Sequence, residues 1–111
     1  IENADADVII MPWGSSKGPA REAYDRLRER GEDVGWLFSV APHPVPDEVK
    51  HVLKSADKII VPELNYPGQW SALLRQEGYR AESITQYTGL PFKPSDLVKR
   101  ISERIGVGVT A

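Results

Sequence analysis

The sequence contains no cysteine, and its two histidines, His43 and His51, lie close together. Within these residues the lack of thiols excludes disulfides, thiolate zinc sites, iron–sulfur ligation and cysteine nucleophiles. The longest apolar run extends only from Val8 to Pro12, far short of the roughly 18 residues that a membrane-spanning helix needs. Neither sign of charge dominates, because 14 basic and 16 acidic residues leave a formal net charge of −2. Bulk charge therefore favours neither nucleic acid nor an anionic membrane as a partner.

The composition that remains is typical of one globular domain. The chain has 111 residues, of which 41% are hydrophobic and 27% charged, and this length leaves no room for a second core. It begins at Ile1 without a basic leader or an apolar signal segment, so we expect a piece of a larger cytoplasmic protein. We expect residues 1–6 to be a linker or the remnant of an upstream strand, 7–106 to be the domain, and 107–111 to be a tail.

One pattern, a strand followed by a loop and a helix, recurs four times along the chain. Short apolar or alternating runs predict strands, and apolar residues at helical spacing predict the helices between them. The predicted strands are 8–11, 34–38, 59–61 and 81–87, and the predicted helices are 19–30, 47–56, one opened by Pro67 and one capped by Ser95. Crossover helices that cover both faces favour parallel strands. The expected fold is a three-layer α/β/α sandwich with a mainly parallel four-stranded sheet in the order 2-1-3-4.

The nine prolines all fall at strand ends, in the loops that follow them, or in the first turns of helices. In a parallel sheet these loops meet at the carboxyl edge, where α/β folds place their ligands. The same loops carry Trp13, Tyr66 and Phe92, large rigid side chains that serve as anchors in interfaces or otherwise need burial under the loop. A stiff, aromatic, weakly charged edge indicates a docking surface. The alternative is that proline only starts helices and reduces loop entropy.

The first loop, Gly14-Ser15-Ser16-Lys17-Gly18, matches the G-x-S-x-G pattern of a nucleophile elbow. We disfavour an esterase, because such an enzyme needs an acid and then a histidine later in the chain, and both histidines lie in the second unit. The loop is better explained by tight turning and helix capping. A weak anion site beside Lys17 stays open. A metal site built on the histidine spacing is disfavoured as well, because His43 lies between prolines outside the helix.

The third loop is more informative than the first. Asn65 is placed to cap the helix that Pro67 opens, Gly68 lets another backbone approach closely, and Gln69 offers both a donor and an acceptor. With the strand order 2-1-3-4, the first and third loops flank the topological switch point and face each other. They form one composite site in this interpretation, and a capping turn without further function is the alternative.

Three stretches in this order resemble the C-terminal domain of the alpha subunit of 2-oxoacid:ferredoxin oxidoreductases. They are Trp13-Gly14-Ser15-Ser16-Lys17-Gly18, Glu63-Leu64-Asn65-Tyr66-Pro67-Gly68-Gln69 and Gly89-Leu90-Pro91-Phe92. The resemblance covers about residues 7 to 105 and implies a transketolase C-terminal-like domain. It also implies an enzyme that oxidatively decarboxylates a 2-oxoacid, such as pyruvate or 2-oxoglutarate, on coenzyme A. Thiamine diphosphate, magnesium and iron–sulfur clusters would serve the whole enzyme, which passes electrons to ferredoxin.

By this resemblance the domain is an assembly and scaffold domain that binds no cofactor, has no catalytic residue and is inactive alone. Its partners would be the remaining domains of the alpha subunit and the beta subunit. The expected docking residues are Trp13, Gly14, Ser15, Ser16, Lys17, Gly18, Asn65, Gly68, Gln69 and Phe92. The alternatives are a domain of another transketolase-like thiamine enzyme, or a stand-alone flavodoxin-like module that binds an anion or a protein.

The family's fold has an antiparallel strand ahead of the first parallel one, and Ile1 to Ala6 is too polar and short to predict that strand. Without it, the second strand, with Trp36 and Phe38, would be an uncovered edge prone to pairing with another chain. The sequence therefore predicts that the fragment self-associates.

Overall fold

The computed structural model describes residues 1–13, 16–38, 47–63, 69–85 and 90–110, and of residues 69, 70 and 106–110 it describes the backbone alone. Four strands alternate with four helices along these segments. The elements are β1 (Val8–Ile10), α1 (Lys17–Glu29), β2 (Val34–Trp36), α2 (Asp47–Ser55), β3 (Lys58–Pro62), α3 (Gln69–Gln76), β4 (Ala81–Ile84) and α4 (Pro94–Thr110). The predicted rhythm of strand, loop and helix is thus confirmed.

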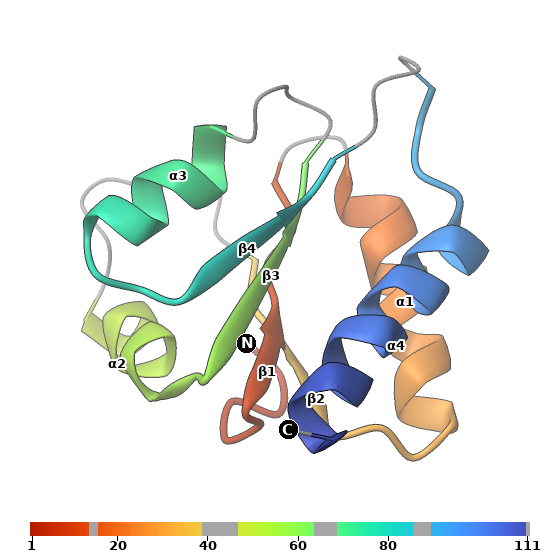
Figure 1. The fold of residues 1–111 in the computed structure, drawn as a ribbon, viewed down its shortest axis with the longest axis horizontal. Coiled ribbons are helices and arrows are strands. Elements are labelled where there is room, and N and C mark those ends of the chain that lie inside the picture. The colour runs from red at the N-terminus through yellow and green to blue at the C-terminus, as the bar shows by residue number, and fades with distance from the viewer. Residues whose placement is uncertain (14–15, 39–46, 64–68, 86–89, 111) are drawn as a thin grey trace.

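The sheet is parallel throughout its four named strands and has the order β2-β1-β3-β4 (Figure 1). Val8 of β1 is paired with Val34 on one side and with Lys58 on the other. The central strands β1 and β3 are almost wholly buried, which is why their sequences are continuous apolar runs without alternation. This arrangement confirms the expected three-layer α/β/α fold and its strand order.

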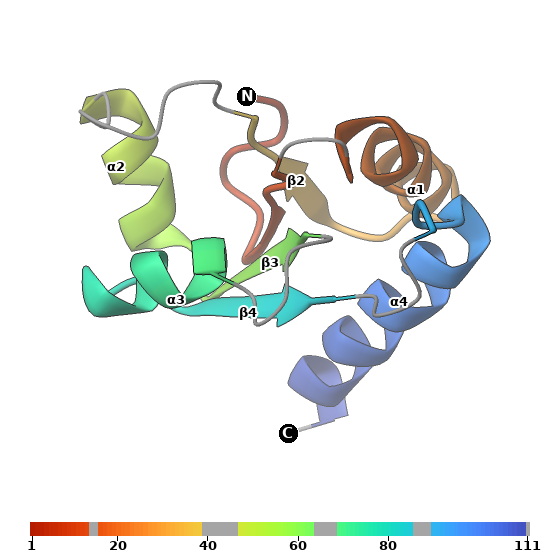
Figure 2. The same cartoon turned by 90° about the horizontal axis from the view of Figure 1, so that it is seen from above.

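Two apolar clusters lie on opposite faces of the sheet, and together they form the core (Figure 2). One cluster joins α1 and α4 to the sheet, and it includes Leu27, Ile60 and Ile101. The other joins α2 and α3 to the opposite face, and it includes Leu53 and Ile59. Since both sheet faces are covered by residues of this chain, the described segments form a domain with its own hydrophobic core.

Glycines follow two of the helices at their C-terminal ends. Gly31 after α1 and Gly78 after α3 have φ values of 85° and 92°, the left-handed conformation in which glycine is favoured. The last helix differs from the expected boundary at residue 106, because α4 continues to Thr110 and takes up most of the expected tail. Leu73 of α3 has 38% of its surface exposed.

The N-terminal segment covers the edge of β2, contrary to the expectation that this edge is open. Glu2 and Trp36 form an antiparallel bridge, with N–H to O distances of 2.9 and 2.8 Å. The Asn3 side chain donates a further hydrogen bond to the Val34 carbonyl. Hydrogen bonds from its backbone and side chains hold this polar segment at the edge of β2, and apolar burial contributes less. The edge from which self-association was predicted is therefore covered along Val34 to Trp36.

An exposed ion pair fastens the same segment to α1. The Arg21 guanidinium bonds to the Glu2 carboxylate and lies over the rings of Tyr24 and Trp36, at 5.1 and 5.3 Å from their centroids. The hydrogen bond from Arg21, together with its positive charge, holds the pKa of Glu2 below its usual value, although desolvation acts in the opposite direction.

The Glu2–Arg21 pair makes the attachment of the segment depend on pH. Because the pKa of Glu2 is lowered in the folded chain, the pair's contribution is present above the ordinary glutamate pKa and is lost as pH falls through the folded pKa. In an NMR titration we expect the Glu2 carboxyl midpoint to rise when Arg21 is replaced by glutamine. Identical midpoints in Arg21→Gln and the parent protein would contradict this assignment.

Candidate functional site

The chain leaves β1 and β3 side by side at the carboxyl edge of the sheet. The Met11 N–H donates to the Ile60 carbonyl at 2.9 Å, and the Trp13 N–H donates to the Pro62 carbonyl at 3.3 Å. β1 and β3 are neighbours at the point where the strand order reverses, which is where α/β sheets place their sites. The start of the first loop therefore lies beside the end of β3, whereas residues 64–68 of the third loop are outside the described residues.

The Ser16 hydroxyl ties the first loop to the end of β3. Its oxygen accepts a hydrogen bond from the Trp13 N–H at 3.1 Å. The same oxygen lies 2.7 Å from the Trp13 carbonyl and 2.6 Å from the Pro62 carbonyl, so its single hydrogen can be donated to either. Ser16 is only 1% exposed, and it makes no side-chain cap to α1. The hydroxyl at the nucleophile position of the G-x-S-x-G pattern is thus engaged within the fold.

Lys17 and Gly18, which follow Ser16, lie on the surface in the first turn of α1. The Lys17 ammonium lies 4.4 Å from the centroid of the Phe38 ring, a cation–π contact that positions this side chain beside the end of β2. A Cβ atom built on Gly18 meets no atom of the described residues within 4 Å. Gly18 is therefore not required by packing inside this chain, and it leaves the start of α1 open to close approach by another molecule.

Glu63 places a buried carboxylate at the start of α3. The residue is fully buried, and its Oε2 accepts a hydrogen bond from the Ser71 N–H at 3.1 Å. Ser71 lies in the first turn of α3, where backbone N–H groups lack partners inside the helix and where the helix dipole favours a negative charge. Glu63 thus accepts a hydrogen bond at the N-terminus of α3. The sequence did not distinguish this role from that of an acidic residue in a surface loop.

The expected docking residues separate into three groups. Trp13, Ser16, Lys17 and Gly18 lie at the carboxyl edge, and Trp13 packs partly buried against the α2 and α3 side of the core. The expected residues outside the described segments are Gly14, Ser15, Asn65 and Gly68. The backbone of Gln69 begins α3, and its side chain is outside the described part.

The third motif is divided between the core and the surface. Phe92 is only 3% exposed and belongs to the cluster beneath α1 and α4, so its ring is a core residue and not a surface anchor. Leu90 is 63% exposed and was not among the expected residues. In the sequence, Leu90 and Phe92 are the two apolar residues on either side of Pro91. Phe92 occupies the core and Leu90 is exposed.

A separate cavity of about 310 Å³ lies at the opposite edge of the sheet, between the amino ends of β1 and β3 and α4. Val8 and Ile105 contribute its apolar wall, and Asp7, Lys58 and Arg104 are among its charged residues. Within the described segments there is no group of three or more His, Cys, Asp or Glu side chains that could hold a metal ion. Nor does any helix in those segments have the length and apolar character needed to cross a membrane.

The structure is a parallel α/β/α domain. Loops form the carboxyl edge of its sheet, and the described polar groups at this edge bond mainly within the domain. The model of pyruvate:ferredoxin oxidoreductase core domain II matches residues 6–97, and the chain belongs to this family.

Curated relatives carry the same domain within longer chains. The chain is 37% identical over 109 residues to the alpha subunit of 2-oxoacid:ferredoxin oxidoreductase 1 from Aeropyrum pernix, covering 94% of this chain and 17% of that one. It is 34% identical over 94 residues to the 2-oxoglutarate oxidoreductase subunit KorA of Mycobacterium tuberculosis, covering 84% and 14%. The chain thus spans about a sixth of the length of the curated relatives that it matches.

Solved structures of two similar proteins share the fold. A 2-oxoglutarate:ferredoxin oxidoreductase from Magnetococcus marinus, with 2-oxoglutarate, coenzyme A and succinyl-CoA bound, superposes with a TM-score of 0.81 at 37% identity, covering 91% of this chain and 18% of that chain. The alpha chain of a probable 2-oxoacid ferredoxin oxidoreductase from Thermoplasma acidophilum gives a TM-score of 0.56 at 30% identity, covering 91% and 90%.

Proposed function

We propose that this chain is an assembly domain in the alpha subunit of a 2-oxoacid:ferredoxin oxidoreductase, and that it docks on neighbouring domains or subunits through the carboxyl edge of its sheet. The observation that carries the proposal is Ser16. The one serine hydroxyl placed as a nucleophile by the G-x-S-x-G pattern is buried and bonded to the Trp13 and Pro62 backbone. Because its hydroxyl is engaged in these bonds, Ser16 stabilises the carboxyl edge and does not supply a reactive group there.

The reaction of the whole enzyme, by this proposal, is oxidative decarboxylation of a 2-oxoacid to an acyl-CoA in the cytoplasm, with electrons passed to ferredoxin. Its thiamine diphosphate, magnesium and iron–sulfur clusters would be held by other parts of the enzyme. This chain has no cysteine to ligate an iron–sulfur cluster, and its described segments contain no group of three or more His, Cys, Asp or Glu side chains that could hold a metal ion. The relatives are named for this class of enzyme, and this supports the proposal.

The surface of the proposed interface begins with Gly18 and Lys17 and includes Leu90. Gly18 leaves space among the described residues at the start of α1, and Leu90 exposes an apolar side chain two residues before the buried core residue Phe92. Pro91 between them fixes its own φ and so limits the conformations of the exposed leucine. An exposed leucine held by a rigid segment loses little entropy when a partner buries it.

Gly18→Trp tests the docking face with little effect on the fold, because a side chain at residue 18 extends into open space. In the full-length protein that carries this chain, we expect the tryptophan to clash with the docked partner. The assembled fraction should fall by roughly tenfold in size-exclusion chromatography with light scattering, and 2-oxoacid-dependent reduction of ferredoxin should fall with it.

The matched control is Glu29→Trp at the exposed C-terminal end of the same helix. This variant adds the same bulk far from the carboxyl edge and should assemble normally. Normal assembly and activity of Gly18→Trp would refute the docking face. Loss of assembly in both variants would assign the effect to the added tryptophan and not to its position.

A further inference from the structure

β4 is the outer strand of the sheet on the side away from the N-terminal segment, and β3 is its one neighbour among the described strands. The carbonyls of Arg80 and Ile84 accept hydrogen bonds from β3 and from Glu63 after it. Because successive residues of a strand direct their backbone groups to opposite sides, the carbonyls of Ala81, Ser83 and Thr85 point outward, away from the sheet.

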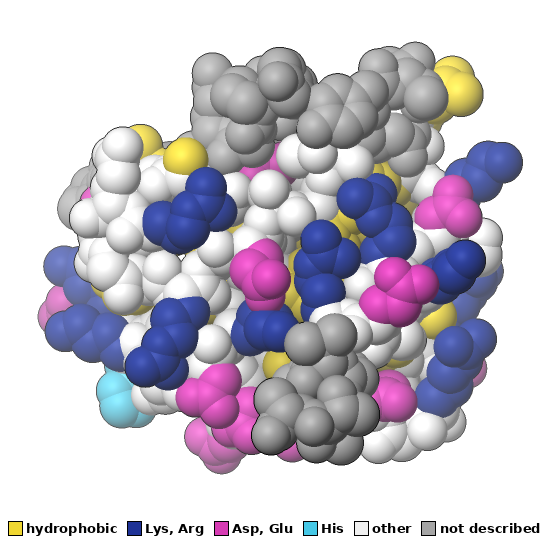
Figure 3. Space-filling model, viewed as in Figure 1, with side chains coloured by type: hydrophobic (Ala, Val, Ile, Leu, Met, Phe, Trp, Pro, Cys, Tyr) yellow, Lys and Arg dark blue, Asp and Glu magenta, His cyan; other side chains and the backbone are white. Residues whose placement is uncertain are grey.

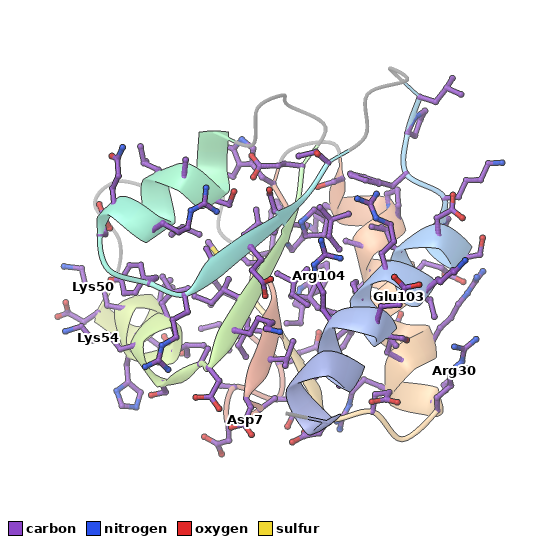
Figure 4. The ribbon with its side chains drawn as sticks, viewed as in Figure 1. Asp7, Arg30, Lys50, Lys54, Glu103 and Arg104 are labelled. Atoms are coloured by element: carbon purple, nitrogen blue, oxygen red, sulfur yellow. The ribbon has the colours of Figure 1, made fainter. Side chains whose placement is uncertain are left out.

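Three arginines bond to these three outward carbonyls. Arg75 of α3 donates to the Ala81 carbonyl at 3.1 Å. From α4, on the other face of the sheet, Arg104 donates to the Ser83 carbonyl at 3.4 Å and Arg100 donates to the Thr85 carbonyl at 3.1 Å. We call Arg75, Arg100 and Arg104 the β4 arginine row. Figure 3 shows blue side chains gathered over this strand and the adjoining helices, and Figure 4 shows Arg104 between α4 and β4.

Arg75 and Arg104 have no carboxylate partner within the described segments. Both bond to backbone carbonyls, and neither forms an ion pair there. Glu82 pairs with Lys58 at 3.4 Å and Asp57 pairs with Arg80 at 3.4 Å, so these two acids pair with other cations. A guanidinium has five N–H donors, so Arg75 and Arg104 each retain donors after bonding one or two carbonyls.

This edge is therefore rich in donors and positive charge, while its outward backbone acceptors are occupied. An added β-strand would need those acceptors for its own N–H groups, and it would have to displace the arginines. Carboxylate side chains offer acceptors alone and match the guanidinium fork. We infer that the β4 edge binds an acidic segment of a protein partner, whose carboxylates pair with Arg75 and Arg104. This surface is separate from the carboxyl-edge face.

A fluorescent octaglutamate peptide is a defined probe of this surface. In the full-length protein that carries this chain, fluorescence anisotropy at low salt should show saturable binding. Arg75→Gln combined with Arg104→Gln should weaken the binding about tenfold, because two exposed charge pairs are lost. An octaglutamine peptide of the same length should not bind to the parent protein, and this comparison needs no variant to fold.

The control removes two other positive charges, by Lys50→Gln combined with Lys54→Gln. Both lysines are exposed and project from α2 away from the sheet (Figure 4). Unchanged binding in this control, with the loss in the arginine variant, supports the inference. Equal weakening in the two variants would show that binding depends only on overall positive charge, and it would overturn the inference. The inference is also overturned if the parent protein shows no saturable binding of the octaglutamate peptide. A third contrary outcome is an arginine variant that self-associates in sedimentation and still binds the peptide.

Discussion

Ser16→Ala should lower the free energy of unfolding by about 1–3 kcal/mol, the range for a buried polar group that loses its partner. The alanine removes the acceptor of the Trp13 N–H at 3.1 Å and the donor that serves the Trp13 or Pro62 carbonyl. The Trp13 N–H still donates to the Pro62 carbonyl at 3.3 Å, so the substitution weakens the contact between the first loop and the end of β3 without abolishing it. Urea denaturation of the 111-residue chain measures the change.

Ser55→Ala is the matched control, because the Ser55 hydroxyl also donates to a backbone carbonyl, that of His51, but does so at an exposed position. Water can replace that bond, so the control should change the free energy of unfolding by less than about 0.5 kcal/mol. Equal stability losses in the two variants would show that the Ser16 hydroxyl is not a buried link between the first loop and the end of β3.

The fold could be predicted because its determinants are local patterns. The apolar runs of β1 and β3, the apolar stripes of the helices and the glycines after α1 and α3 each report burial or a backbone conformation directly. The bridge between Glu2 and Trp36 could not be predicted in this way. It depends on a backbone contact between distant residues, and a polar hexapeptide carries no signal for such a contact.

The candidate site was predicted by position more successfully than by role. The strand order predicts that the first and third loops lie together. The hydrogen bond from the Trp13 N–H to the Pro62 carbonyl places the start of the first loop beside the end of β3, and residues 64–68 of the third loop lie outside the described part of the chain. The roles of Ser16 and Phe92 depend on burial, which the loop sequence does not report: one is a buried hydrogen-bonding link and the other is a core residue. The β4 arginine row was missed because its members belong to two helices and meet only at the strand edge.

Gly35→Ala should be more harmful than its size suggests, because Gly35 lies where the N-terminal segment crosses β2. A Cβ atom at residue 35 would lie 2.5 Å from the Asn3 carbonyl oxygen and would also overlap the Ile9 side chain. The isoleucine can shift, but the Asn3 backbone is held by side-chain hydrogen bonds to Asp33 and Val34. We expect a loss of about 1–3 kcal/mol in the free energy of unfolding, the usual cost of overpacking.

The structure also predicts how this loss is distributed. The added methyl group should push the N-terminal segment away from β2, so the Trp36 N–H, which donates to the Glu2 carbonyl, should lose protection from hydrogen exchange. The Leu37 N–H, which donates to Ile10 on the other side of the strand, should keep more of its protection.

Gly18→Ala makes the same chemical change at a glycine with open space around it, and it should be neutral or stabilise by up to about 1 kcal/mol because alanine favours the helix. If Gly35→Ala proves as stable as Gly18→Ala, or if both amides lose protection equally, the close crossing of the N-terminal segment over Gly35 is not what closes this edge of the sheet.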